Sequence, residues 1–248
     1  MTEKPTFVFV PGAWHPAASL DKIIRPLEAQ GYRTKSVDLA SYGAEPPLKD
    51  FQPDVGMIRR MIEEVVDNGQ DVVLFMHSYA GVVGCEACKG LDKQSRQEQG
   101  QSGGVIRLFF CAAFLAPEGA SLLDMLNGKP LPWFNISDDQ MTVNPANPEG
   151  TFYNDVDPVI VRETKTTLKS HSYQTFYSKL TYPAWRDIPV TFLFCKKDKA
   201  IPIEAQEGMV AASKVDVIRE MADAGHSPFL SVPDQVVAAL RRAAGKTL

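Results

Sequence analysis

The stretch DVVLFMHSYAGVVG, residues 71–84, decides how this chain folds. An apolar run rich in β-branched and aromatic residues stops at Ser78 and passes into small residues, which predicts a serine at a strand-to-helix turn. Such a turn is a nucleophile elbow, whose pattern G-x-S-x-G keeps the residues two before and two after the serine small. Here Met76 and Ala80 occupy those positions, and Gly81 comes one place late. A buried strand followed by a serine N-cap would show the same pattern, so the rest of the chain must decide.

Outward from this stretch, short apolar strands alternate with amphipathic helical segments, which predicts an α/β protein with a doubly wound, mostly parallel sheet. We expect further strands at residues 6–10, 33–39, 105–114, 190–195 and 214–221, and helices at residues 19–30, 55–68 and 233–244. Residues 89–104 are polar and end in glycines, so we expect a surface loop there.

Residues 117–186 interrupt this alternation and are rich in Pro, Asn, Asp and aromatic residues. We expect them to form an inserted lid over the C-terminal edge of the sheet, where ligands of such sheets bind. Residues 1–116 and 187–248 would then form the core domain. An ordinary packed helical insertion would have a similar composition, and both descriptions can hold for different faces.

Composition narrows the classes of function. With 248 residues, 44% of them hydrophobic, the chain is long enough for one α/β domain with an insertion. The net charge of −4 comes from mixed charges, which indicates neither a nucleic-acid nor a membrane partner. No apolar segment resembles a signal peptide or a membrane span, so we expect a cytoplasmic protein. The four cysteines lie in or beside apolar runs, which favours buried thiols over disulfides, a metal or a redox site.

A serine becomes a nucleophile at neutral pH only beside a histidine base that a carboxylate orients. Asp198 lies in the turn after strand 190–195, and His226 lies in the loop after the last expected strand. Each residue alone would indicate a solvated surface group, but the order Ser, Asp, His is the one associated with a nucleophile elbow. We therefore expect Ser78, Asp198 and His226 to be catalytic, with Asp223 as the alternative carboxylate.

The loop after the first strand is the candidate second half of an oxyanion hole. We expect the N–H groups of Ala13 and Tyr79 to bind a developing oxyanion, because Gly12 allows a close approach and Tyr79 follows the nucleophile. His15 in this loop is a second candidate base, and we expect His77 to be packed and hydrogen-bonded.

Aromatic side chains are the candidate substrate-binding groups, because an apolar pocket with few polar anchors selects substrates by shape. We expect Trp14, Trp133 and Tyr153 to serve this role. No phosphate-binding glycine pattern accompanies them, and we expect no cofactor.

Four motifs together carry a resemblance to a known family: FVFVPGAWHPAASLDKIIRPLEAQGYRTKSVDLASYG near the N-terminus, MHSYAG, DKAIP and AGHSPFLS. The chain resembles the α/β-hydrolase superfamily, specifically the group of plant methyl esterases, hydroxynitrile lyases and related microbial hydrolases. The likeness covers nearly the whole chain and is weakest in the lid. It implies the α/β-hydrolase fold with Ser78 as nucleophile, His226 as base and Asp198 as its partner. The family's His-Gly at the oxyanion loop is Pro11-Gly12 here.

We therefore expect a serine hydrolase that cleaves an ester, thioester or lactone of a small, largely apolar substrate, as a monomer or a homodimer. Two alternatives stay open: a lyase that cleaves a C–C bond, of the hydroxynitrile-lyase or retro-Claisen kind, and a non-catalytic small-molecule receptor. The resemblance favours hydrolysis over cyanohydrin cleavage at two positions. Those lyases carry a threonine where this chain has Gly12 and a lysine where it has Ser227.

Overall fold

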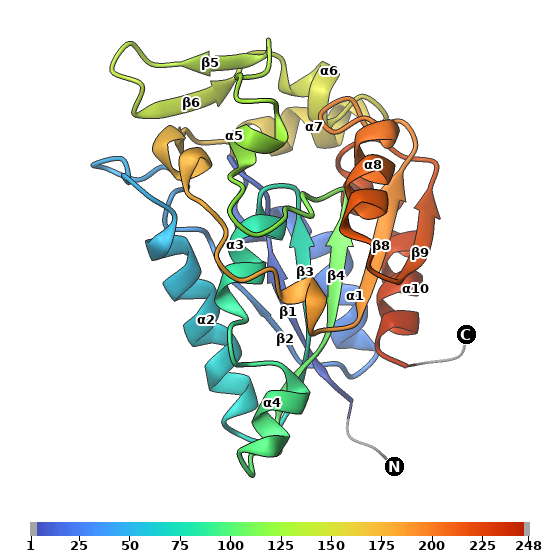
Figure 1. The fold of residues 1–248 in the computed structure, drawn as a ribbon. Coiled ribbons are helices and arrows are strands. Elements are labelled where there is room, and N and C mark those ends of the chain that lie inside the picture. Colours follow the sequence, from blue (N-terminus) through green and yellow to red (C-terminus); the bar gives the residue numbers. More distant parts are fainter. Residues whose placement is uncertain (1–3, 246–248) are drawn as a thin grey trace.

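A six-stranded parallel sheet forms the centre of the computed structural model, which describes residues 4–245 (Figure 1). In spatial order the strands are β2 (Thr34–Ser36), β1 (Thr6–Val10), β3 (Asp71–His77), β4 (Gly104–Cys111), β8 (Val190–Cys195) and β9 (Val217–Ala222). Every neighbouring pair is parallel, so the C-terminal ends of all six strands lie at one edge.

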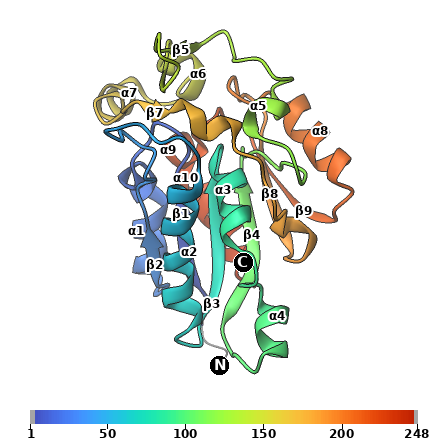
Figure 2. The ribbon, with the colours of Figure 1, turned by 60° about the vertical axis from the view of Figure 1, so that its left-hand side comes forward.

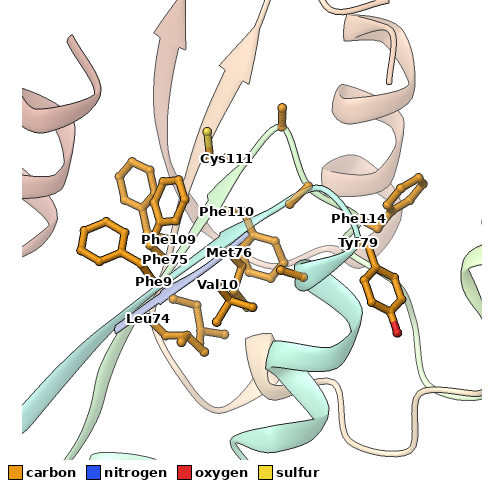
Figure 3. Close-up of a cluster of buried hydrophobic side chains, with 14 of the residues drawn as sticks. Phe9, Val10, Leu74, Phe75, Met76, Tyr79, Phe109, Phe110, Cys111 and Phe114 are labelled. Carbon is orange, nitrogen blue, oxygen red and sulfur yellow. The ribbon is translucent and has the colours of Figure 1, made fainter. Parts of the chain in front are cut away.

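Both faces of the central strands β1, β3, β4 and β8 are largely buried, which explains why these strands are almost continuously apolar. Along one row, the rings of Phe9 and Phe75 lie 5.3 Å apart and those of Phe75 and Phe109 lie 5.7 Å apart (Figure 3). The next row in register points to the opposite face, because side chains alternate along a strand. Its members are Val10, Met76 and Phe110.

Helices cover the two faces of the sheet. On one face α1 (Asp21–Ala29) packs on α10 (Pro233–Ala243), and on the other α2 (Gln52–Val66) packs on α3 (Ala80–Ala87) (Figure 1, Figure 2). Besides α4 (Lys93–Glu98), the core also contains η1 (Ala17–Leu20), α8 (Ile203–Ser213) and α9 (Pro228–Ser231). None of the helices within residues 4–245 combines the length and the apolar character needed to cross a membrane.

The expected surface loop at residues 89–104 is wrong in part, because it contains the helix α4 (Lys93–Glu98). Asp92 caps this helix by accepting a hydrogen bond from the Ser95 amide at 2.8 Å. Arg96 is buried; its Nε donates to the Gly103 carbonyl at 2.7 Å, and its Nη2 pairs with Asp67. A capped helix with one anchored arginine needs no apolar stripe, so hydrophobic periodicity did not reveal it.

The segment between β4 and β8 forms a second, antiparallel sheet and several short helices. The strands are β5 (Phe134–Ile136), β6 (Thr142–Pro145) and β7 (His171–Ser172). The helices are α5 (Leu122–Met125), α6 (Pro148–Phe152), α7 (Pro158–Lys165), η2 (Tyr173–Tyr177) and η3 (Ala184–Arg186). Both ribbon views place β5, α5, α6 and α7 beyond the end of the sheet where the C-termini of the strands lie (Figure 1, Figure 2). That the segment acts as a lid stays a prediction.

Two glycines of α3 let this helix pack closely where β3 turns into it. A Cβ at Gly84 would overlap the sulfur of Met76. The elbow pattern makes room with a small residue two positions before the serine. Here Met76 stands at that position, and the missing side chain of Gly84 makes the room. A Cβ at Gly81 would overlap the carbonyl oxygen of Phe114, which is backbone and has no room to move aside. Met76 is therefore compatible with a tight turn at Ser78.

We expect Gly81→Ala to destabilise the protein by more than about 2 kcal/mol, because the new methyl group would push α3 away from the backbone of Phe114 in a closely packed site. Gly208→Ala is the matched control: it also lies inside a helix, but a Cβ there would have no other atom within 4 Å. That control should be neutral or stabilising by up to about 1 kcal/mol. Urea unfolding of both variants measures the difference, and equal stabilities would contradict this account of the turn.

Candidate active site

Ser78 lies at the turn between β3 and α3 with a φ of 56°, in the left-handed region that non-glycine residues rarely adopt. Its carbonyl oxygen accepts hydrogen bonds from the amides of Gly81 and Phe114, both at 3.1 Å. The Ser78 amide donates to the carbonyl of Cys111 at 3.4 Å. The strained conformation is therefore held by backbone bonds to α3 and to the end of β4, and it presents the side chain at the edge of the sheet.

His226 and Asp198 lie in the loops after β9 and β8, and their side chains meet. His226 Nδ1 lies 2.8 Å from Asp198 Oδ2, and both residues are buried. Asp198 Oδ1 accepts from the amides of Ala200 and Ile201 at 2.8 Å, and Oδ2 lies 3.3 Å from Gln206 Nε2. These bonds fix the position of the carboxylate. Because a carboxylate accepts hydrogen bonds, a neutral His226 ring carries its proton on Nδ1, and Nε2 is the acceptor.

Asp223, the alternative carboxylate, makes a different contact. Its Oδ2 pairs with Lys197 Nζ at 2.8 Å, and 69% of its side chain is exposed. The Lys197 ammonium lowers the pKa of Asp223, chiefly through their hydrogen bond. Asp223 thus belongs to a solvated surface pair, and Asp198 is the carboxylate that contacts His226.

The loop after β1 approaches Ser78 closely. A Cβ at Gly12 would lie 2.8 Å from His77 Nδ1 and 3.0 Å from Ser78 Cβ, so only glycine fits there. Ala13 and Tyr79 line the same pocket as Ser78. Within residues 4–245, neither of their amides donates to a loop, turn or side-chain acceptor. That these two N–H groups form an oxyanion hole stays a prediction.

The Tyr79 side chain ties the start of α3 to α2. Its hydroxyl donates to Asp54 Oδ2 at 3.0 Å, and Asp54 also accepts from the amide and the hydroxyl of Ser41, at 2.8 and 2.7 Å. Burial raises the pKa of both Asp54 and Tyr79. This buried network holds the residue that follows Ser78.

Two further histidines lie close by, and protein groups contact both ring nitrogens of His15 and Nε2 of His77. His15 Nδ1 lies 2.7 Å from the Ala13 carbonyl and Nε2 lies 2.7 Å from the Tyr153 hydroxyl, and burial lowers the pKa of His15 to about 4. His77 Nε2 lies 2.8 Å from the His226 carbonyl, which is the packed, hydrogen-bonded environment expected for it. Burial, followed by the nearby His226, lowers the pKa of His77 well below its usual range. With both nitrogens occupied, His15 is poorly placed to act as a base.

Ser78 and His226 line one narrow pocket whose remaining walls are apolar. The walls consist of Ala13, Trp14, Tyr79, Phe114, Leu122, Leu126, Leu131, Trp133, Phe134, Phe152, Phe176, Ala200 and Ile201. Two of the three aromatic residues expected to bind substrate, Trp14 and Trp133, are in this wall. Tyr153 is not: it is buried, and its hydroxyl contacts His15 instead.

Sequence reasoning missed several residues that support this site. Gln206 is fully buried in α8 and bonds the Asp198 turn, but a single polar residue in a helix gives no signal of its own. The same holds for Asp54 at the first turn of α2. Across residues 4–245, no group of three or more His, Cys, Asp or Glu side chains lies close enough to hold a metal ion, and the four cysteines are free and buried.

We expect the free energy of unfolding to fall as pH drops from about 6.5 toward 4. Burial lowers the pKa of His171 to about 3 and that of His15 to about 4, from an ordinary value of 6.5. Between those limits the unfolded chain binds protons that the folded chain does not, so stability increases with pH, by up to about 1.4 kcal/mol per pH unit for each such histidine.

His171→Phe tests this expectation, because it keeps an aromatic ring beside Phe176 and removes one titrating group. Chemical unfolding between pH 7 and 4.5 should show a shallower pH dependence in the variant than in the wild type. Parallel curves would mean that His171 does not titrate differently in the two states.

Comparisons with known proteins show the family of this chain. The model of the alpha/beta hydrolase family matches residues 7–239. The chain is 30% identical over 250 residues to the alpha/beta hydrolase nvfD of Aspergillus novofumigatus, which covers 99% of this chain and 98% of that relative. It is 25% identical over 268 residues to methylesterase 7 of Arabidopsis thaliana, covering 97% and 96% of the two chains.

Among solved structures, polyneuridine aldehyde esterase is similar in fold, with a TM-score of 0.77 and 19% identity over 97% of this chain and 99% of that one. The family match spans the sheet, the turn at Ser78 and the loops that carry Asp198 and His226. This chain belongs to the alpha/beta hydrolase family.

Proposed function

We propose that this protein is a serine hydrolase that cleaves an ester, thioester or lactone of a small, largely apolar substrate. The observation that carries the proposal is the shared pocket: Ser78, in its strained turn, and His226, bonded to Asp198, open into the same apolar cavity. A serine and an imidazole in one pocket, with a buried carboxylate bonded to the imidazole, are the groups that acyl transfer needs.

In the first half of the reaction, Ser78 Oγ attacks the substrate carbonyl carbon and its proton passes to His226 Nε2. Asp198 stabilises the imidazolium through Nδ1–H, at the observed 2.8 Å. Negative charge develops on the carbonyl oxygen, where the amides of Ala13 and Tyr79 bind it. Each such donor lowers the barrier by roughly 3 to 4 kcal/mol. The tetrahedral intermediate then expels the alcohol, thiol or ring oxygen, which takes the proton from His226.

In the second half, water attacks the acyl-enzyme carbonyl and gives a proton to His226. The intermediate collapses, the acid leaves, and Ser78 Oγ recovers the proton. One water is consumed and one ester bond is broken, so no cofactor enters the balance.

The chemistry of the pocket wall limits the substrate class. Ser78 and His226 are the polar side chains of the pocket apart from the ring edges of its aromatic residues, so a charged substrate group placed there would have no partner. We infer that the substrate places an uncharged acyl or alkoxy group in this pocket. Trp14, Trp133 and Phe152 would select that group by its shape. The names methylesterase and polyneuridine aldehyde esterase, borne by two similar proteins, support ester chemistry for this chain.

Hydrolysis is favoured over cyanohydrin cleavage at two positions. Gly12 has no hydroxyl to bind a substrate oxygen, and a Cβ there would crowd Ser78. Ser227, directly after His226, is neutral and fully buried, so it supplies no cation for a departing anion.

We expect a fluorophosphonate to add covalently to Ser78 and an ester and lactone panel to include substrates. Ser78→Ala and His226→Ala should each remove nearly all turnover, and the double variant should be scarcely worse than either, because such residues act as a unit. Intact-mass spectrometry measures the adduct, and a chromogenic short-chain ester measures turnover. Ser227→Ala is the control for labelling of a neighbouring serine and should keep the adduct. An adduct retained by Ser78→Ala, or additive losses in the double variant, would contradict the proposed nucleophile and base.

Asp198→Asn should reduce turnover on the order of 10⁴-fold, because an amide at this position can hold the imidazole in the wrong tautomer. Asp223→Asn is the matched control and should stay within about twofold of wild type, since its partner is Lys197 at the surface. Steady-state kinetics and circular dichroism of both variants separate catalysis from folding. If Asp223→Asn is the damaging change, Asp198 is not the orienting carboxylate.

A further inference from the structure

Three consecutive residues of the inserted segment, Tyr153, Asn154 and Asp155, contact three different loops of the site. The Tyr153 hydroxyl lies 2.7 Å from His15 Nε2, in the loop after β1. Asn154 Nδ2 donates to the carbonyl of Lys197 at 3.1 Å, in the turn after β8. Asp155 Oδ2 accepts from the amide of Gly225 at 2.8 Å, in the loop after β9. We call residues 153–155 the clamp.

The clamp holds the residues that directly precede the base and its carboxylate. Gly225 is followed by His226, and Lys197 is followed by Asp198. The two loops are also bonded to each other, since the Lys197 amide donates to the carbonyl of Ala224 at 2.9 Å. The relative position of these two loops sets the contact between His226 Nδ1 and Asp198 Oδ2.

The fit at Gly225 is close. A Cβ there would lie 2.5 Å from Asn154 Oδ1 and 2.6 Å from Asp155 Oδ1, so the loop is pressed directly onto the clamp. Both of these oxygens are buried and have no hydrogen-bond partner within the described residues. The Asp155 carboxylate therefore places one buried oxygen against the loop and bonds the other to the amide of Gly225, the residue before the base.

We propose that Asp155 is a positioning residue for His226. Through the clamp, the inserted segment helps to orient the base. Asp155 holds the amide of Gly225, one peptide before the bond to His226, and Asn154 holds the carbonyl of the peptide before Asp198. Together they set the approach of the imidazole to Ser78. The inference rests on the proposed hydrolase function. It assigns Asp155 no contact with substrate.

Asp157 provides a matched comparison within the same segment. Its Oδ1 also accepts one backbone amide, that of Val159 at 2.7 Å, but it does so as the N-cap of α7 and is exposed. Removing either carboxylate deletes one hydrogen bond to a backbone N–H. Of these two carboxylates, only that of Asp155 bonds the loop of His226. Comparing variants at Asp155 and Asp157 therefore separates an effect on the position of His226 from a general loss of stability.

The experiment compares Asp155→Ala, Asp155→Asn and Asp157→Ala in the full chain. Asp155→Ala should lower kcat for a chromogenic short-chain ester about 10- to 100-fold with KM within about twofold, because small displacements of a reacting group have costs of this size. Asp155→Asn should recover most of that loss, since its amide oxygen still accepts from Gly225. Asp157→Ala should keep kcat within about twofold of wild type.

A second readout does not depend on turnover. The downfield proton resonance of His226 Nδ1–H, assigned by its loss in His226→Ala, should shift or broaden in Asp155→Ala and stay unchanged in Asp157→Ala. If Asp155→Ala fails to fold, Asp155→Ser takes its place, because the shorter side chain also removes the carboxylate.

Equal kcat in wild type and Asp155→Ala, with an unchanged resonance, would overturn the proposal and leave Asp155 a structural residue. Equal losses in Asp155→Ala and Asp157→Ala would do the same. A wild-type protein that neither hydrolyses esters nor reacts with a fluorophosphonate would instead refute the proposed function, and the resonance would still report whether Asp155 orients His226.

Discussion

Ser78 is held in the left-handed backbone region, and the elements around it are arranged so that this conformation persists. A non-glycine residue there costs about 1 to 3 kcal/mol, which the packing of its surroundings must offset. Gly81 lies against the carbonyl of Phe114, and Gly84 leaves room for the sulfur of Met76. Gly12, from the loop after β1, lies against Ser78 itself. The strain is therefore supported by three segments that meet at one edge of the sheet.

Four buried histidines lie at or near this edge, and their ring nitrogens contact different groups. His15, His77 and His171 are buried, and their lowered pKa values keep them neutral at physiological pH. Among residues 4–245, His226 is the histidine that contacts a carboxylate. The three neutral imidazoles thus differ from His226 in the partners of their ring nitrogens, because within the described residues a carboxylate contacts only the ring of His226.

The segment between β4 and β8 has two roles in this arrangement. Its side chains at Trp133, Phe134 and Phe152 form pocket wall, while residues 153–155 bond the loops of the core. Changes in the wall can alter the shape of the pocket without moving the loops. Changes at residues 153–155 act on the loops directly, so we infer that substrate choice and orientation of the base depend on different parts of one segment.

The sequence by itself determined the alternation of buried strands and amphipathic helices, and with it a parallel sheet whose C-terminal edge carries Ser78, Asp198 and His226. These features follow from hydrophobic periodicity and from the direction of parallel strands, which neighbouring residues encode locally. It also indicated the loop of Ala13 and the aromatic residues Trp14 and Trp133.

Only the tertiary structure decided which polar side chains meet. Asp198 and Asp223 both follow strands, and the packing of the β8 and β9 loops brings Asp198 to His226 and leaves Asp223 with Lys197. Packing likewise directs Tyr153 to His15 and Asp155 to Gly225, across 138 and 70 positions of the chain. Such partners depend on loop conformations that no local pattern of hydrophobicity specifies, because a hydrogen bond needs its two atoms within about 3 Å.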